Sequence, residues 1–321
     1  MTKLIDRFGR HIEYVRLSLT EACNFACPYC RPQVDLSGLT KGLAVKEWMP
    51  ILEAFHELGI RAIRLTGGEP LLYPHLEELL QEMTKKRWFE DISLTTNGSL
   101  LAENAEMLKK AGAHRVNVSL DALTEESFRV ATGGYGNLEE VKEGIFAAHE
   151  AGLGPIKVNT VLSRSYTEEE VAAFLVLMEE WPVIWRFIEY MPFQGKDFRG
   201  PTFSEWKGLL EKVAGKELQP LSFTEGFGPA SYYAFEGGKQ IGFIFPMTHS
   251  YCDSCNRLRV TSDGKLRLCL LRKEEVPLWE GAGDTTVERV KEKLIQAVAA
   301  KEEEHEGYDS SPEKEMFRIG G

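Results

Sequence analysis

Cysteine is absent from the long middle of this chain, between residues 31 and 251. All six cysteines therefore fall into two groups of three, one toward each end. A basic excess is also absent, since the formal net charge is −11 at pH 7, and general nucleic-acid binders normally show the opposite balance. We therefore expect no nucleic-acid partner, and any anion-binding site must be a local basic patch.

Long apolar runs are missing as well. The opening residues, MTKLIDRFGRHIEY, contain no stretch of signal-peptide type, and no later segment is long and uncharged enough to cross a bilayer. Hydrophobic residues make up 43% of the 321 residues, which is ordinary for a globular chain with a sizeable core. We expect a cytoplasmic protein with no membrane partner, in which clustered cysteines bind metal more often than they form disulfides.

The two cysteine groups have the spacing of metal sites. The first comprises Cys23, Cys27 and Cys30 within CNFACPYC, and the second comprises Cys252, Cys255 and Cys269. Three thiolates are one too few to close a tetrahedral zinc site or to ligate every iron of a four-iron cluster. A metal with an open position can bind a small molecule, so two such groups suggest an enzyme. Spacing alone leaves open a zinc knuckle for the first group and a Cys₃His zinc site with His249 for the second.

Short β-rich runs alternate with amphipathic helical stretches between residues 14 and 190. The predicted strands are Tyr14–Leu19, Ala62–Thr66, Asp91–Thr95, Arg115–Leu120, Ile156–Leu162 and Ile184–Tyr190. The predicted helices are Val45–Phe55, Leu76–Met83, Ala105–Ala111, Leu138–Ala148 and Val171–Met178. Successive strand–helix units predict a parallel sheet with right-handed crossovers.

Most of the predicted strands have one polar face. Arg16 and Ser18 alternate with apolar residues in the first strand, as Arg64 and Thr66 do in the second. A doubly wound sheet would instead show nearly continuous apolar runs, and the intervening helices count against an antiparallel sheet with one wet face. We therefore predict an α/β fold, an incomplete (β/α)6 barrel of the TIM type with a polar lumen.

Loops at the carboxyl ends of the strands build the active site in such barrels. The corresponding loops here are CNFACPYC, Thr66–Pro70, Thr95–Gly98, Ser119–Asp121 and Glu189–Pro192. Each one alone is explained by turn chemistry, because glycine, asparagine, aspartate and proline are the usual turn residues. Their convergence on one rim favours an active site there.

The pattern changes after residue 222. Short β-like runs at Ser231–Phe235 and Gln240–Phe245 lead into a strand–turn–strand between Cys255 and Cys269, with Asp263-Gly264 as its turn. A charged helix follows around Thr286–Ala300, and the run KEEEHE (Lys301–Glu306) is interpreted as a solvated segment. We expect two domains, a partial barrel over residues 1–222 and a C-terminal extension over residues 223–321.

The motif C-x-x-x-C-x-x-C, with an aromatic residue before its last cysteine and directly after a first barrel strand, resembles the signature of radical S-adenosylmethionine enzymes. GGEP at Gly67–Pro70 continues that resemblance. The run CDSCNRLRVTSDGKLRLC is further similar to the MoaA family of GTP 3′,8-cyclases, which act in molybdenum cofactor biosynthesis. Other matching motifs are IGFI (Ile241–Ile244), IEYMP (Ile188–Pro192), KVN (Lys157–Asn159) and the terminal Gly320-Gly321.

This resemblance implies two [4Fe–4S] clusters, S-adenosylmethionine as cofactor and GTP as substrate. The first cysteine group would hold the cluster that binds S-adenosylmethionine, and the second group the cluster that faces guanine, within an iron–sulfur-binding C-terminal extension. Positions implied to contact S-adenosylmethionine are Tyr29, Gly68, Ser119 and Met191. Positions implied to contact GTP are Arg16, Arg64, Thr95, Lys157, Arg257, Leu258 and Arg259. Gly320 and Gly321 correspond to a tail that assists catalysis in that family.

The implied reaction is that of a lyase, which converts GTP into 3′,8-cyclo-7,8-dihydroguanosine triphosphate for a cyclic pyranopterin monophosphate synthase. An electron donor of unspecified identity is also implied, and a homodimer is left open. Two rivals remain: a peptide-modifying radical S-adenosylmethionine enzyme with one auxiliary cluster, and an iron–sulfur carrier or zinc-stabilised binding module. The chain departs from the family pattern at Arg31, where methionine is common, and at Tyr73-Pro74-His75, where basic residues are expected.

Overall fold

The protein is seen here in a computed structural model, which describes residues 3–30, 42–191, 200–222, 226–304 and 316–319. Its framework is one curved sheet whose central strands β1 to β6 are parallel and lie in chain order. These strands are β1 (Tyr14–Ser18), β2 (Ala62–Thr66), β3 (Asp91–Thr96), β4 (Arg115–Ser119), β5 (Ile156–Leu162) and β6 (Val183–Glu189). The six predicted strands are thus confirmed, with every end within one residue.

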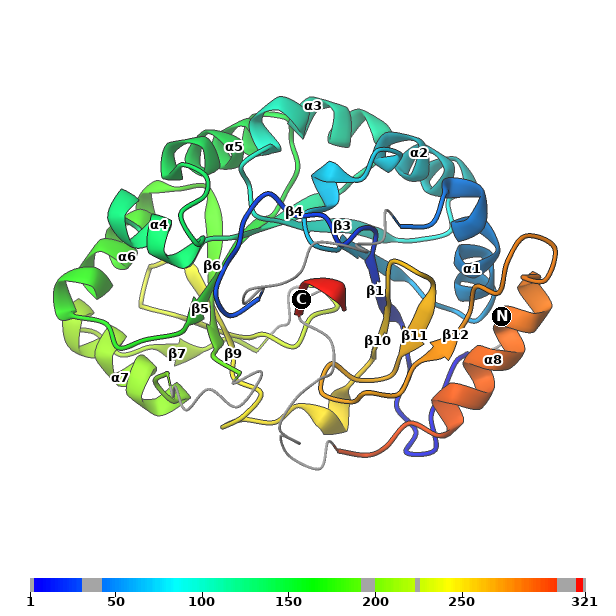
Figure 1. Cartoon of the computed structure of the whole chain (residues 1–321). Helices are drawn as coiled ribbons and strands as arrows, with labels where there is room; N and C mark the ends of the chain where they lie inside the picture. Colours follow the sequence, from blue (N-terminus) through cyan, green and yellow to red (C-terminus); the bar gives the residue numbers. More distant parts are fainter. Residues whose placement is uncertain (1–2, 31–41, 192–199, 223–225, 305–315, 320–321) are drawn as a thin grey trace.

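Helices cover the outer face of this arc (Figure 1). They are α1 (Val45–Glu57), α2 (Leu76–Lys86), α3 (Leu101–Ala111), α4 (Glu125–Ala131), α5 (Leu138–Glu150), α6 (Glu168–Glu180) and α7 (Phe203–Ala214). The five predicted helices are present, and α4 and α7 were not predicted. Helix α4 is short and buries only Phe128, whereas α7 has an apolar stripe that includes Trp206 and Leu210 and was overlooked in the sequence.

Strands that follow β6 in the chain extend the sheet at both edges. Beside β1 lies β10 (Arg257–Val260), and beside β6 lies β9 (Gln240–Ile244), both in parallel pairing. Antiparallel strands continue outward from these two. They are β11 (Lys265–Arg267) and β12 (Val276–Pro277) at one edge, and β8 (Ser231–Ala234) and β7 (Gln219–Pro220) at the other.

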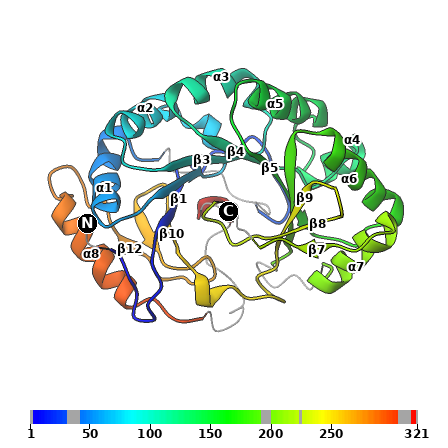
Figure 2. The same cartoon turned by 180° about the vertical axis from the view of Figure 1, so that it is seen from behind.

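The described sheet does not close, since β12 and β7 are its two ends, so the predicted incomplete barrel is confirmed. Figures 1 and 2 show the arc of strands inside the arc of helices from both sides. Pairing between β7 and β8 carries the sheet across residue 222, where we placed a domain boundary. The division into residues 1–222 and 223–321 stays a prediction.

Alternating side chains explain why the arc has an apolar outside and a polar inside. In β1, Val15 and Leu17 are fully buried in the hydrophobic core, whereas Arg16 lies between them on the opposite face. The facing helix α1 contributes Trp48 and Phe55 from one stripe. Each large apolar side chain buried in this way contributes about 1.5–3 kcal/mol, so the outer layer fixes the sheet and leaves the lumen for polar groups.

The C-terminal region packs back onto this framework. Helix α8 (Val287–Ala299), close to the predicted range, lies against α1, and Lys291 Nζ is 2.5 Å from Glu57 Oε2. A short 3₁₀ turn, η4 (Met316–Arg318), lies within the arc in both views (Figures 1 and 2). Phe317 and Ile319 are each only 1% exposed. No helix in the described ranges is long and apolar enough to cross a membrane.

Candidate functional site

The first cysteine group lies in the loop that follows β1, against the GGEP loop that follows β2. The amide of Gly68 donates to Thr20 O at 2.7 Å, and that of Glu69 donates to Ala22 O at 2.7 Å. A Cβ added at Gly68 would lie 2.3 Å from Ala22 O, which no side chain tolerates. Glycine is therefore required for the two loops to approach, and the approach positions the start of the cysteine loop.

Glu69 ties these loops to the end of β3. Its buried carboxylate accepts hydrogen bonds from Leu71 N at 3.1 Å, Thr96 Oγ1 at 2.8 Å and Asn97 N at 2.7 Å. Burial raises its pKa to about 7, although these three donors favour the charged form. Asn97 in turn lies next to the cysteine loop, because its Nδ2 donates to Asn24 Oδ1 at 2.8 Å.

A second carboxyl, Asp121, holds the far end of the cysteine loop. Tyr29 OH donates to Asp121 Oδ2 at 2.8 Å, and Val161 N donates to Asp121 Oδ1 at 2.7 Å. Burial raises the pKa of Asp121 to about 6. Burial, with added repulsion from Cys30 and Asp121, also raises the pKa of the Cys27 thiol well above its usual range. The surroundings of the first group are thus apolar and acidic.

The remaining residues predicted to contact S-adenosylmethionine lie at the same end of the barrel. Ser119 is the last residue of β4, and Met191 follows the end of β6 by two residues. Both are half-buried. The structure therefore brings Tyr29, Gly68, Ser119 and Met191 to one rim, as expected for loops at the carboxyl ends of parallel strands.

A row of arginines crosses the lumen face of the sheet. In register across five neighbouring strands, the row contains Arg267, Arg259, Arg16, Arg64 and Ser93 from β11, β10, β1, β2 and β3. Burial and the neighbouring guanidinium of Arg257 lower the pKa of Arg259 to about 10. Burial and the charge of Arg259 likewise lower the pKa of Arg16 well below its ordinary value. So many buried like charges are costly, and a bound polyanion would offset that cost.

Further polar groups lie on the same face. Lys157 is 1% exposed on β5, and Arg186 on β6 donates to Asn159 Oδ1 at 2.9 Å and to Asn117 Oδ1 at 2.7 Å. Burial lowers the pKa of Arg186 to about 10. Thr95 Oγ1 is buried and has no hydrogen-bond partner among the described residues. Buried hydroxyls normally have a partner, so this atom fits a ligand in the lumen.

The second cysteine group lies between β9 and the end of β11. Cys252, Cys255 and Cys269 line one cavity of about 300 Å³, together with Leu268 and Lys301. His249 lies elsewhere: it lines a separate small aromatic cavity, and its ring is 6.0 Å from that of Phe203. The structure therefore does not support the Cys₃His zinc site that spacing left open.

The thiols of the second group are near positive charge. Burial raises the pKa of Cys255, but the charges of Arg257 and Lys301 outweigh this and the net shift is downward. The guanidinium of Arg257 lies 4.6 Å from the centre of the Tyr251 ring. Thiolate ligands are favoured in such surroundings.

Both groups fit an iron–sulfur cluster with an open iron, because each offers three thiols at a half-buried site. In the described part of the chain, no three His, Cys, Asp or Glu side chains surround one point closely enough for a single metal ion. A four-iron cluster does not require that arrangement, since each cysteine binds a different iron.

Some predicted positions behave differently. Leu258 is fully buried in the hydrophobic core, between the two lumen arginines of β10, so only its main chain could contact a lumen ligand. Tyr73, where the family pattern has a basic residue, is 3% exposed and donates to Leu43 O at 2.5 Å, so it has a packing role. His75 is exposed.

Gly320, Gly321 and Arg31 lie outside the described residues. The nearest described tail residue, Ile319, accepts from Arg259 Nη1 at 3.5 Å.

Sequence reasoning missed several residues. Arg186 was missed because it is the single basic residue in the mostly apolar strand Val183–Glu189, where alternation gives no signal. Lys301 was interpreted as part of a solvated run, which was wrong, since it is only 4% exposed. Its neighbours Glu302, Glu303 and Glu304 are exposed as expected.

Comparison with known proteins agrees with this arrangement. The profile of the Radical SAM superfamily matches residues 17–178, and that of Molybdenum Cofactor Synthesis C matches residues 183–307. A solved structure of Streptococcus suis SuiB bound to S-adenosylmethionine superposes with a TM-score of 0.66 at 14% identity, over 92% of this chain and 69% of that chain. At this identity the superposition shows the fold alone.

Curated relatives are closer in sequence. A GTP 3′,8-cyclase of Syntrophomonas wolfei is 40% identical over 99% of this chain and all of its own length. One of Petrotoga mobilis is 37% identical over the same shares. These relatives match the chain over nearly its whole length. The chain belongs to the GTP 3′,8-cyclase family of radical S-adenosylmethionine enzymes.

Proposed function

We propose that this chain converts GTP into 3′,8-cyclo-7,8-dihydroguanosine triphosphate, in the first step of molybdenum cofactor biosynthesis. The observation that carries the proposal is the row of buried arginines on the lumen face, in register across β11, β10, β1 and β2. A nucleoside triphosphate would bring negative charge to this row of buried cations. A peptide substrate gives no comparable reason for it, so the peptide-modifying alternative is not favoured.

In this proposal the rim holds S-adenosylmethionine. Cys23, Cys27 and Cys30 would bind a [4Fe–4S] cluster with one open iron, and Tyr29, Gly68, Ser119 and Met191 would surround the cofactor. When bound, the cluster and S-adenosylmethionine supply a 5′-deoxyadenosyl radical, which serves a reaction that joins ribose C3′ to guanine C8. The protein orients this chemistry through Asp121, which fixes Tyr29, and Glu69, which fixes the GGEP loop.

The lumen would hold the triphosphate. Arg16, Arg64 and Arg259 offer forked donors that suit phosphate oxygens, and Lys157 adds a compact charge. Arg257 also faces the lumen from β10, and Leu258 would contribute only its main chain. Thr95 Oγ1 would find in the ligand the partner that it lacks among the described residues. Arg186 joins this set because the structure places it on the same face.

The second group would complete the site. Cys252, Cys255 and Cys269 would bind a second [4Fe–4S] cluster whose open iron faces guanine. Gly320 and Gly321 would assist catalysis, and the residue before them, Ile319, accepts a hydrogen bond from the lumen residue Arg259.

The wider setting is proposed on chemical grounds. Clustered thiols suit the reducing cytoplasm. A reductant must supply an electron for each radical event, and the product would pass to a cyclic pyranopterin monophosphate synthase.

Isotope transfer tests the proposal. Anaerobically reconstituted protein is given dithionite, S-adenosylmethionine and GTP deuterated at C3′, and the 5′-deoxyadenosine formed is analysed by mass spectrometry. We expect deuterium in that product, and none when the label is at C2′. Cleavage of S-adenosylmethionine without deuterium transfer from C3′ would contradict GTP as the substrate. If protein that carries both clusters does not cleave S-adenosylmethionine, the assignment as a radical enzyme is contradicted.

A further inference from the structure

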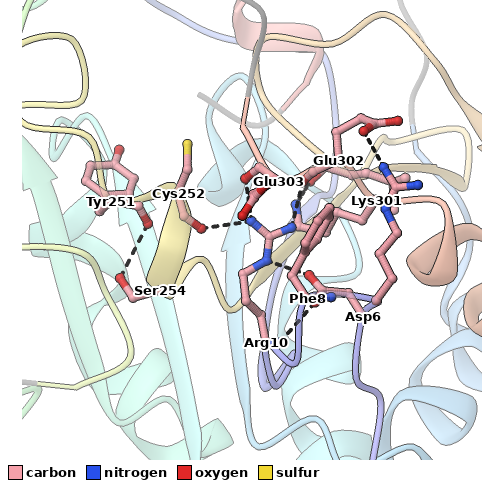
Figure 3. A network of polar contacts seen from close by, with 11 residues as sticks. Asp6, Phe8, Arg10, Tyr251, Cys252, Ser254, Lys301, Glu302 and Glu303 are labelled. Atoms are coloured by element: carbon pink, nitrogen blue, oxygen red, sulfur yellow. Dashed lines mark hydrogen bonds and ion pairs between the residues drawn. The ribbon is translucent and has the colours of Figure 1, made fainter.

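Two buried cations lie behind the second cysteine group, and each donates to the main chain at or beside a cysteine. Arg10 Nη1 donates to Cys252 O at 2.8 Å, and Lys301 Nζ donates to Leu268 O at 2.5 Å, one residue before Cys269. Both side chains line the cavity that the three cysteines share. Figure 3 shows Arg10 between Asp6, Cys252 and Glu303, with Lys301 close by.

Arg10 is held in place by partners on several segments. Its Nε lies 2.5 Å from Asp6 Oδ2, and its other nitrogens donate to Glu302 O and Glu303 O at 2.6 Å. The side chain of Asp6 is 0% exposed and that of Arg10 is 6% exposed, so this ion pair is shielded from water. The charge of Arg10 is therefore neutralised locally, and its role is to join the loop of Cys252 to the segment after α8.

Lys301 differs from Arg10 in its charge balance. In the part of the chain that the structure describes, no carboxylate lies within ion-pair distance of Lys301 Nζ. The carboxylates on the cavity, those of Glu274, Glu302, Glu303 and Glu304, belong to exposed residues. Exposed charges are screened by water and salt, whereas a buried ammonium acts through a low dielectric. Lys301 thus brings net positive charge to the second group.

Around Cys27 of the first group, none of the charged side chains that shift its pKa among the described residues is a cation. There the nearby charged group is Asp121, and burial dominates. A cluster that gains an electron gains negative charge, so positive surroundings favour its reduced form and acidic surroundings its oxidised form.

We propose that Lys301 is a positioning residue of the second cysteine group, which fixes the main chain beside Cys269 and raises the reduction potential of the cluster bound there. This rests on the proposed function, because it requires a cluster at Cys252, Cys255 and Cys269. The inference goes beyond the ligand set, because it gives a lysine just after α8 a part in setting the potential of the second cluster.

Three substitutions separate the charge of Lys301 from its hydrogen bond. Lys301→Met removes both, Lys301→Gln removes the charge and keeps a donor, and Lys301→Arg keeps both. Lys293→Met is the matched control, since Lys293 lies on α8 and likewise donates to a carbonyl, Pro277 O at 2.6 Å, but is paired with Glu280 at 2.7 Å. The full chain is reconstituted with both clusters, and each cluster is titrated with dithionite and followed by electron paramagnetic resonance.

The cluster whose signal responds to S-adenosylmethionine is assigned to the first group. For the other cluster we expect Lys301→Met and Lys301→Gln to lower the equilibrium constant for reduction about tenfold, which is about 59 mV for a one-electron couple. Lys301→Arg and Lys293→Met should leave the potential of this cluster unchanged. The potential of the first cluster should stay the same in every variant.

An unchanged potential in Lys301→Gln, or an equal shift in both clusters, overturns the role of Lys301 while leaving the proposed function intact. If Lys301→Met loses the second cluster, the lower iron content supports the role of Lys301 in fixing the main chain beside Cys269. The potential measured in Lys301→Gln then tests the role of its charge. Failure of the wild-type chain to bind a second cluster would contradict the proposed function and this inference together.

Discussion

The first cysteine group lies at the barrel rim beside the buried carboxyl of Asp121, whereas the second lies at the sheet edge beside Arg257 and Lys301. Both groups offer the same kind of side chain, yet the pKa of Cys27 is raised and that of Cys255 is lowered. Three thiols in sequence therefore do not define a site. The charges that the fold places around them decide how readily each group takes up negative charge.

This contrast matches the work that each group would do. A cluster that must reduce S-adenosylmethionine needs a low potential, which apolar and acidic surroundings favour. A cluster that binds a nucleotide beside a cationic lumen does not need a low reduction potential. The lumen arginines link the two regions, so the predictions below test each region and then the link.

Loss of a ligand should have the largest effect. Cys27→Ala should reduce formation of 5′-deoxyadenosine to the background of the assay, because the first group then lacks a ligand. Cys255→Ala should keep some cleavage of S-adenosylmethionine but lose the cyclised product. Liquid chromatography of both products checks this, with iron content as a control for loading. Equal loss of cleavage in both variants would break the distinction between the groups.

Removal of a lumen charge should have the next largest effect. Arg64→Ala should raise KM for GTP about 10- to 100-fold, because a hydrogen bond to a charged group is worth about 1.5–3 kcal/mol. KM for S-adenosylmethionine should change little. Arg61→Ala is the matched control, since Arg61 lies just before β2 and pairs with Glu90 at the surface, where its side chain is 45% exposed. Similar kinetics for the two variants would contradict a triphosphate site in the lumen.

Glu69 gives a pH-dependent effect. Its pKa is raised to about 7 in the fold from an ordinary value of 4.5, so the folded state holds a proton that the unfolded state releases. Its contribution to stability is present below about pH 4.5 and is lost as pH rises through about 7.

Urea unfolding between pH 4.5 and 8 measures this effect. The free energy of unfolding should fall with pH by on the order of 1–3 kcal/mol more in the wild type than in Glu69→Gln, which cannot titrate. Parallel pH profiles for the two proteins would show that Glu69 is ionised throughout, as its three hydrogen-bond donors favour.

Tyr29→Phe should have the smallest effect. It removes the hydroxyl that donates to Asp121 and should destabilise the protein by about 0.5–1.5 kcal/mol. KM for S-adenosylmethionine should rise modestly, and the second cluster should be unaffected. Thermal unfolding and steady-state kinetics measure the two effects. A changed spectrum of the second cluster would mean that the two regions are coupled more tightly than the structure indicates.

The sequence predicted the strands well because most of them have a simple alternation, as in Arg16 between Val15 and Leu17. It also predicted which of these strand cations face the lumen, since side-chain direction follows from position in a strand. The contacts with S-adenosylmethionine and GTP came from family resemblance and stay predictions.

Other residues could not be found in this way. Arg186 lies in a strand that is otherwise apolar, and Lys301 lies in a run of charges that resembles a solvated tail. Both are buried by segments distant in sequence: Arg186 by Asn117 and Asn159, and Lys301 by the loop of Leu268. Burial by long-range contacts leaves no local pattern, which is why tertiary structure was needed to identify them.

The contrast between the two cysteine groups is tested most directly by ligand-specific spectroscopy of the reduced wild-type protein. Electron paramagnetic resonance is recorded with no ligand, with S-adenosylmethionine, with GTP and with both. We predict that S-adenosylmethionine perturbs one cluster signal, that GTP perturbs the other, and that the two changes add. Perturbation of a single signal by both ligands, or no response to GTP in protein that carries both clusters, would contradict the account.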